Sequence, residues 1–126
     1  MKPVGEMTIG ELAAFVCTHL KEHGIDVVLS GGACVSLFTE NRYQSFDLDF
    51  IENVVTGRKK IREVLKKIGF IEEHRYYKHP DTDFFLEFPP GPLSIGDEPV
   101  RETMEKKFST GVLRLLSPTD CVKDRF

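Results

Sequence analysis

The sequence predicts a single α/β domain of the α+β kind, with a short, mixed, twisted sheet and helices packed mainly on one face. Three observations support this prediction. The chain has 126 residues, 40% of them hydrophobic and 29% charged, which is enough for one buried core. Segments with the apolar spacing of a helix alternate with short segments typical of strands. No internal repeat or linker-like stretch precedes residue 89, so we expect residues 1–126 to form one domain.

A helix opens the expected order of elements. Thr8 and Glu11 have the spacing of a capping box, in which each side chain accepts a hydrogen bond from the other residue's backbone. Gly24 marks the end of this helix. Between them, apolar residues recur at the spacing of one helix face, at Leu12, Phe15, Val16 and Leu20.

Short strands and helices are expected to follow. β-branched residues predict a strand over 25–29, and residues 33–38 are typical of a helix that starts from the turn at 30–32. Apolar and polar residues alternate over 45–51, which predicts a second strand. An amphipathic helix is expected from residue 56 or 57 up to Gly69.

The second half of the chain is predicted to be richer in strands. We expect one strand over 70–77 and its partner over 83–88, joined by the turn at 79–82. Residues 105–108 and 112–116 are expected to form a hairpin.

A final helix is predicted to start at Ser117, with Pro118 in its first turn. It would have fewer than about ten residues before Phe126, which is marginal for an isolated helix. We therefore expect the natural chain to continue beyond Phe126, the alternative being that the tail packs on the core or on another subunit.

Composition excludes several classes of function. Seventeen Lys and Arg against twenty Asp and Glu give a net charge of −3, which argues against a protein that binds nucleic acid mainly by neutralising phosphates. No apolar run approaches the roughly 20 residues of a membrane span, and the first residues lack the apolar centre of a signal peptide. The three cysteines, Cys17, Cys34 and Cys121, are widely spaced, with no metal-binding spacing. We expect a cytoplasmic protein in which Cys17 is a core residue, with a catalytic cysteine as the minor alternative.

Acidic residues inside apolar strands are the strongest chemical signal. Asp47 and Asp49 lie two residues apart, so both carboxylates are expected on one face of a strand. Glu87 lies in a later strand among apolar residues and would complete a group of three if the two strands are neighbours. A hard divalent cation such as Mg²⁺ would offset their repulsion. The alternative is that these acids lie on solvated strand edges.

The turn at Ser30-Gly31-Gly32 connects a predicted strand to a predicted helix. Glycines let the backbone approach a ligand closely, and amides at a helix N-terminus attract phosphate. A tight turn without any ligand also recruits glycine, so this signal is weak alone.

Taken in order, these features resemble the nucleotidyltransferase superfamily, which has a polymerase-beta-like fold. The resemblance covers roughly residues 25–88 and rests on the Gly-Gly turn, the Asp-x-Asp strand and the later strand with Glu87. Arg42 and Ser45, just before the Asp pair, are similar to the Arg and Ser/Thr that precede it in many members. Residues 113–125 resemble a segment of minimal or toxin-type bacterial nucleotidyltransferases, which continue into helices that this chain lacks.

The resemblance implies a metal-dependent nucleotidyltransferase that moves an NMP group from an NTP to a hydroxyl of an RNA, a protein or a small molecule. Asp47, Asp49 and Glu87 would be the catalytic residues and would bind Mg²⁺ or Mn²⁺, with Glu87 helping to deprotonate the acceptor. A toxin–antitoxin role belongs within this hypothesis, with a cognate antitoxin or a second copy of the chain as possible partners.

The same resemblance implies a set of nucleotide-binding residues. Ser30, Gly31 and Gly32 would hold the phosphates, with Ser45 as a further contact. By their charge, Arg42 and Lys78 are further candidates for contacting either the triphosphate or the acceptor. The basic run over 58–67 is interpreted as a solvated helix face, or else as a rim that contacts RNA. Tyr76 and Tyr77 either pack in the sheet or stack on a base.

Two other functions stay open. A non-catalytic relative would keep the fold and bind nucleotide, or serve as an interaction module, without transferring anything. A purely structural domain would have its acids on solvated edges, and loss of Asp47 or Asp49 would then be neutral or stabilising.

Overall fold

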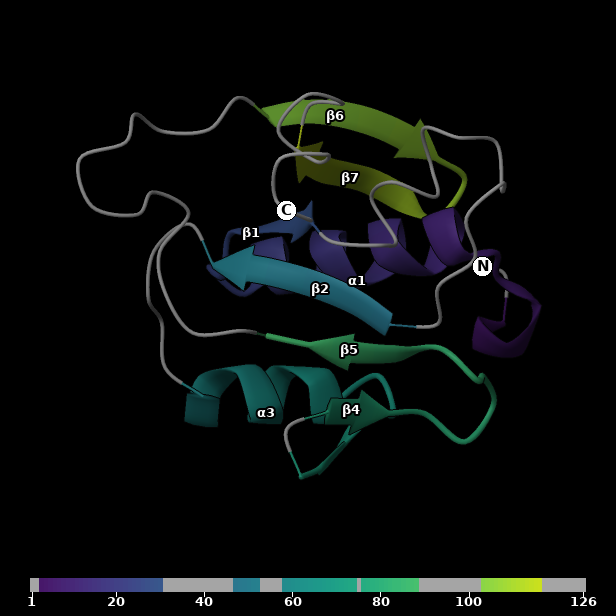
Figure 1. Cartoon of the computed structure of the whole chain (residues 1–126), viewed down its shortest axis with the longest axis vertical. Helices are drawn as coiled ribbons and strands as arrows, with labels where there is room; N and C mark the ends of the chain where they lie inside the picture. The colour runs from purple at the N-terminus through teal and green to yellow at the C-terminus, as the bar shows by residue number, and fades with distance from the viewer. Residues whose placement is uncertain (1–2, 31–46, 53–57, 75, 89–102, 117–126) are drawn as a thin grey trace.

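The computed structural model describes residues 3–30, 47–52, 58–74, 76–88 and 103–116. Within these ranges there are two α-helices and one mixed sheet of seven strands, which places the domain in the α+β class (Figure 1). The expected mixed sheet is therefore confirmed.

The helices begin and end close to where their signals predict. A short 3-10 turn at Val4–Glu6 precedes α1, which spans Ile9–Glu22, and α3 spans Arg58–Lys66. The capping box is formed: the Thr8 N–H donates to Glu11 Oε1 at 3.0 Å, and the Glu11 N–H donates to Thr8 Oγ1 at 3.2 Å. Gly24 and Gly69, just beyond the two helices, have φ angles of 82° and 93°, a backbone conformation that glycine adopts without a steric penalty.

Loss of the Thr8 cap is expected to destabilise the fold modestly. Thr8→Ala removes one acceptor from the first turn of α1, which costs about 1 kcal/mol of unfolding free energy in comparable helices. Urea unfolding followed by circular dichroism measures this loss, and Thr8→Ser is the matched control because it keeps the hydroxyl. Equal stability of Thr8→Ala and the unmodified protein would contradict the capping role.

The sheet has the strand order β3-β4-β5-β2-β1-β7-β6. The pairs β1·β7 and β2·β5 are parallel, and the other neighbouring strands are antiparallel. The strands are β1 (Val27–Ser30), β2 (Asp47–Glu52), β3 (Ile71–Glu73), β4 (Tyr76–Lys78), β5 (Phe85–Glu87), β6 (Thr103–Phe108) and β7 (Gly111–Leu116).

The helices α1 and α3 lie on the same face of the sheet and enclose the core with it (Figure 1). Leu48 and Phe50 of β2 are fully buried in this core, and the Phe50 ring stacks on Phe88 at a centroid distance of 5.8 Å. Tyr77 meets Phe88 edge-on, and its hydroxyl donates to Glu72. The helix-covered face is thus apolar in the middle of the sheet.

One strand prediction is wrong. Residues 70–77 do not form a single strand, because the chain reverses between β3 and β4, which pair with each other in antiparallel register. His74 has a φ of 60°, the left-handed conformation of a tight reversal. Two glutamates precede it, so this part of the segment is polar and does not continue a buried strand. The predicted pairing of the next strand across the 79–82 turn is confirmed, since β5 pairs antiparallel with β4.

The predicted hairpin near the end of the chain is confirmed as β6 and β7. Other predicted elements lie outside the described residues: the turn at 31–32, the helix over 33–38, the start of the second strand at 45–46 and the final helix from residue 117. None of the described helices is long and apolar enough to cross a membrane.

Candidate functional site

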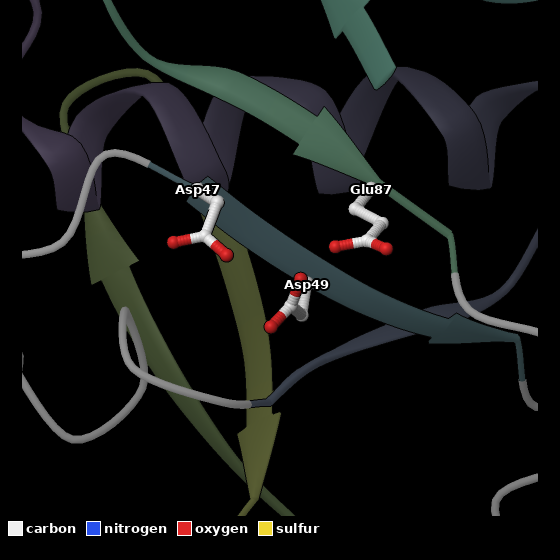
Figure 2. A group of neighbouring side chains, drawn as sticks. All are labelled: Asp47, Asp49 and Glu87. Atoms are coloured by element: carbon white, nitrogen blue, oxygen red, sulfur yellow. The ribbon is translucent and has the colours of Figure 1, made fainter. Parts of the chain in front are cut away.

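Two aspartates project from β2 on the side away from the helices. Leu48 and Phe50 are buried in the core, so the alternation of the strand places Asp47 and Asp49 on the opposite face, where both are half-buried (Figure 2). The prediction that one face of this strand carries both carboxylates is confirmed.

A glutamate from the neighbouring strand joins them. β5 lies parallel to β2 with Glu87 directly beside Asp49, so the Glu87 side chain extends from the same face of the sheet (Figure 2). One carboxylate oxygen from each of Asp47, Asp49 and Glu87 lies within 4.8 Å of the others. Three acids from two strands thus meet at one place, as the sequence predicts if the strands are neighbours.

This donor set suits a hard divalent cation. Mg²⁺ and Mn²⁺ prefer oxygen ligands, and carboxylates this close repel one another unless positive charge lies among them. Oxygens bound to one Mg²⁺ at about 2.1 Å lie about 3–4 Å apart, so small side-chain rotations would close the 4.8 Å group on a single ion. Two ions about 3.5–4 Å apart also fit a group of this width. Asp49 Oδ1 is buried, which places part of the cluster away from bulk water.

Ser30 ends β1 beside the carboxylates. It pairs with Asp49 across the strands, is almost fully buried, and its hydroxyl donates to the Asp49 carbonyl oxygen at 3.3 Å. The described part of the Gly turn therefore starts next to the acidic cluster. The remaining predicted phosphate contacts, Gly31, Gly32, Arg42 and Ser45, lie outside the described residues.

Lys78 and Tyr76 lie on β4, at the other side of β5. Tyr76 pairs with Glu87 and Lys78 pairs with Phe85, so both side chains share the face of the carboxylates. Lys78 Nζ is 3.8 Å from a carboxylate oxygen of Glu73, and both side chains are more than half exposed. Lys78 therefore lies at the rim of the carboxylate face, on β4, two strands away from Asp47 on β2. The sequence leaves Tyr76 open between packing and base stacking, because its position opposite Glu87 depends on the register of β4 and β5.

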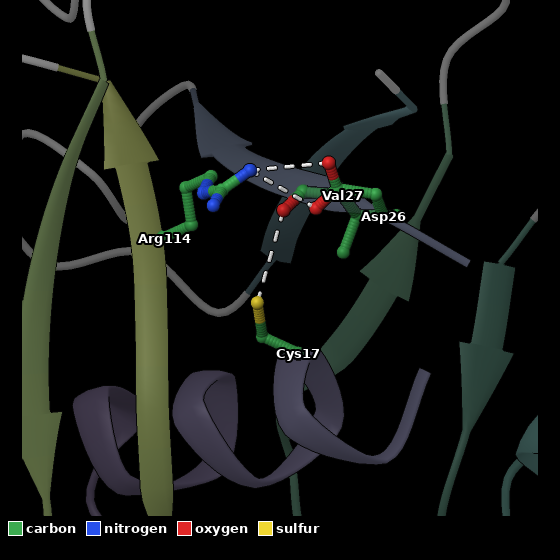
Figure 3. A network of polar contacts seen from close by, with 4 residues as sticks. All are labelled: Cys17, Asp26, Val27 and Arg114. Atoms are coloured by element: carbon green, nitrogen blue, oxygen red, sulfur yellow. Dashed lines mark hydrogen bonds and ion pairs between the residues drawn. The ribbon is translucent and has the colours of Figure 1, made fainter. Parts of the chain in front are cut away.

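The structure offers no support for a catalytic cysteine at Cys17. Burial raises the pKa of the Cys17 thiol, and Sγ donates to the Val27 carbonyl at 3.7 Å (Figure 3). The Arg114 guanidinium nearby binds both carboxylate oxygens of Asp26, at 3.3 and 3.1 Å. A buried, protonated thiol is a poor nucleophile, so Cys17 is a core residue as predicted. Cys34 and Cys121 lie outside the described residues.

The basic run lies away from the carboxylates. α3 covers the opposite face of the sheet, and its charged side chains after Arg58 are exposed. Arg62 Nε forms an ion pair with Glu72 Oε1 at 3.1 Å. This placement favours the interpretation of a solvated helix face over an RNA rim beside the acidic site.

The fold that carries this site is nucleotidyltransferase-like. The aminoglycoside nucleotidyltransferase ANT(2")-Ia, solved in complex with adenylyl-2"-tobramycin, matches this structure with a TM-score of 0.55 and 15% sequence identity. The match covers 86% of this chain and 69% of that one. No protein-family model matches the sequence, and no curated protein matches it significantly. The similarity is therefore one of fold.

Proposed function

We propose that this protein is a metal-dependent nucleotidyltransferase, which transfers an NMP group from an NTP to a hydroxyl acceptor. The observation that carries the proposal is the convergence of Asp47, Asp49 and Glu87 within 4.8 Å on the face of the sheet opposite α1 and α3, in a nucleotidyltransferase-like fold. The polymerase-beta-like arrangement expected from the sequence belongs to this proposal.

Asp47, Asp49 and Glu87 would hold one or two Mg²⁺ or Mn²⁺ ions. Such ions offset the negative charge that develops on a phosphoryl group during in-line displacement. Glu87 extends from the side of the cluster opposite Ser30, which suits it to accept the proton of the acceptor hydroxyl. The acceptor oxygen then forms a bond to the α-phosphorus, and the bond from that phosphorus to pyrophosphate breaks.

The predicted nucleotide-binding residues complete the proposal. The turn at Ser30-Gly31-Gly32 would hold the leaving phosphates beside Asp49, with Arg42 and Ser45 as the predicted further contacts. Lys78 is predicted to contact either the triphosphate or the acceptor, and its place on β4 suits the acceptor. The acceptor is a hydroxyl of an RNA, a protein or a small molecule. A toxin–antitoxin role and a cytoplasmic location remain predictions from the sequence.

A transfer assay tests the proposal. The protein is incubated with each α-labelled NTP in turn, with Mg²⁺ or Mn²⁺, and with total cellular RNA, total protein or a small-metabolite extract as acceptor. We expect label to move to one acceptor class and to depend on the metal, so that EDTA abolishes it. Binding of NTP with metal but no transfer to any acceptor would favour the non-catalytic alternative.

Metal binding is expected to stabilise the fold. A ligand that binds the folded state alone adds about 2.7 kcal/mol of stability at a hundred times its Kd, so Mn²⁺ should raise the melting temperature measurably. The shift should disappear in Asp47→Asn, which removes one charged ligand. Glu63→Gln, at an exposed position on α3, is the matched control and should keep the shift. An equal shift in Asp47→Asn would show that the metal binds elsewhere.

A further inference from the structure

A row of four side chains crosses the face of the sheet opposite α1 and α3. Ser30 of β1 pairs with Asp49 of β2, Asp49 pairs with Glu87 of β5, and Glu87 pairs with Tyr76 of β4. Neighbouring strands are about 4.8 Å apart, so this row spans about 14 Å. The acids lie in the middle of the row, with the start of the Gly turn at one end and an aromatic ring at the other.

A hollow of about 440 Å³ opens at the aromatic end of the row. Its lining includes Tyr76, Lys78 and Phe85, and Phe85 lies directly beside Asp47 in the parallel pairing of β5 with β2. The volume lies in the range of about 300–1,000 Å³ that is typical of sites for small molecules. Two residues of the lining, Tyr76 and Phe85, therefore pair across neighbouring strands with two members of the acidic cluster, Glu87 and Asp47.

The lining combines two aromatic rings and one lysine with one exposed carboxylate, Asp83, and the rings with the lysine favour a flat ring joined to an anion. The half-buried rings of Tyr76 and Phe85 meet edge-on, with centroids 4.9 Å apart and planes 77° apart. In proteins that bind single-stranded nucleic acid, aromatic side chains on a sheet face stack on nucleobases, whatever the base. Lys78 extends from the rim, where its exposed ammonium can exchange the Glu73 carboxylate for a phosphate.

We propose that this hollow is the acceptor subsite, that it receives a nucleotide with a free hydroxyl, and that Tyr76 is the residue which sets this specificity. The inference rests on the proposed function, because in-line displacement requires the acceptor to approach from the side opposite the leaving pyrophosphate. With the phosphates held at the β1 end, that side is the β4 end. The shared chemistry is a terminal nucleotide, which comes either from an RNA strand or from a free nucleotide.

A binding experiment separates this subsite from the donor site. The donor site is saturated with a non-hydrolysable NTP analogue and Mg²⁺, and a fluorescent single-stranded RNA oligonucleotide with a free 3′ hydroxyl is titrated with protein. AMP and a tyrosine-containing peptide serve as competitors. Tyr76→Ala is expected to weaken RNA binding about 5- to 150-fold, because one stacking surface is lost. Tyr76→Phe keeps the ring and should stay within about twofold of the unmodified protein.

Lys78→Gln gives a second, independent readout. It removes one phosphate contact, so the slope of log affinity against log salt concentration should fall by about 0.7. Lys66→Gln, at an exposed position on α3, is the matched control and should leave the slope unchanged. Lys78→Gln therefore still tests the subsite if Tyr76→Ala unfolds the protein.

The outcomes are distinct. Tighter binding of AMP than of the oligonucleotide would support a free nucleotide as the ligand, and tighter binding of the oligonucleotide than of AMP would support an RNA strand. The subsite is overturned if neither RNA nor AMP binds, if Tyr76→Ala and Lys78→Gln change nothing, or if the peptide binds in their place. A normal Mn²⁺ melting shift alongside any of these failures would leave the proposed transferase function standing. Absence of that shift from the unmodified protein would instead count against the transferase itself.

Discussion

Asp49→Asn is expected to reduce nucleotidyl transfer by about 10³-fold or more while the fold stays intact. The amide has the shape of the carboxylate but lacks its charge, so the cluster loses the ligand that lies between Ser30 and Glu87. A 10³-fold loss corresponds to about 4 kcal/mol of transition-state stabilisation, which is within the several kcal/mol that a metal ion supplies. Initial rates of label transfer at saturating NTP measure this loss.

Stability measurements show whether the loss is chemical. Without added metal, Asp49→Asn should unfold at the same temperature as the unmodified protein or slightly higher, because it relieves repulsion among three carboxylates within 4.8 Å. Glu63→Gln removes an acid outside the cluster and should keep both activity and stability. Full activity in Asp49→Asn would contradict the catalytic role of the cluster.

Phe50→Ala is expected to destabilise the protein by about 3–5 kcal/mol of unfolding free energy. Phe50 is fully buried, lies on the reverse side of the strand that carries both aspartates, and stacks on Phe88. Truncation leaves a cavity at the centre of the core, directly behind the acidic cluster. Urea unfolding followed by circular dichroism measures the change.

Two further variants calibrate this result. Phe50→Leu fills most of the cavity and should cost clearly less than Phe50→Ala. Ile71→Ala removes a strand side chain that is 64% exposed, and the loss should stay below about 1 kcal/mol. A cost of less than about 1 kcal/mol for Phe50→Ala would show that this face of β2 is not the core face.

Local sequence signals explain the parts of the fold that were predicted correctly. The Thr8 and Glu11 capping box depends on residues three apart, and the shared face of Asp47 and Asp49 depends on the two-residue period of a strand. Such signals act within a few residues, so a single sequence contains them completely.

Local signals do not specify which distant strands pair with each other, or in which register. Nothing in residues 47–52 or 85–87 specifies that β2 and β5 lie side by side in parallel register, so Glu87 was predicted only as a conditional third ligand. The reversal at His74 was missed because no glycine or proline marks it. The role inferred for Tyr76 depends on the pairing of β2 with β5 and on the reversal at His74. Together they place β4 beside β5, with Tyr76 opposite Glu87.

The most direct test of the metal site is anomalous diffraction from crystals of the protein soaked in Mn²⁺ with a non-hydrolysable NTP analogue. We expect one or two manganese peaks bounded by the side chains of Asp47, Asp49 and Glu87, with the phosphates on the Ser30 side. Manganese density at another position, or a Glu87 carboxylate turned away from both aspartates, would contradict it.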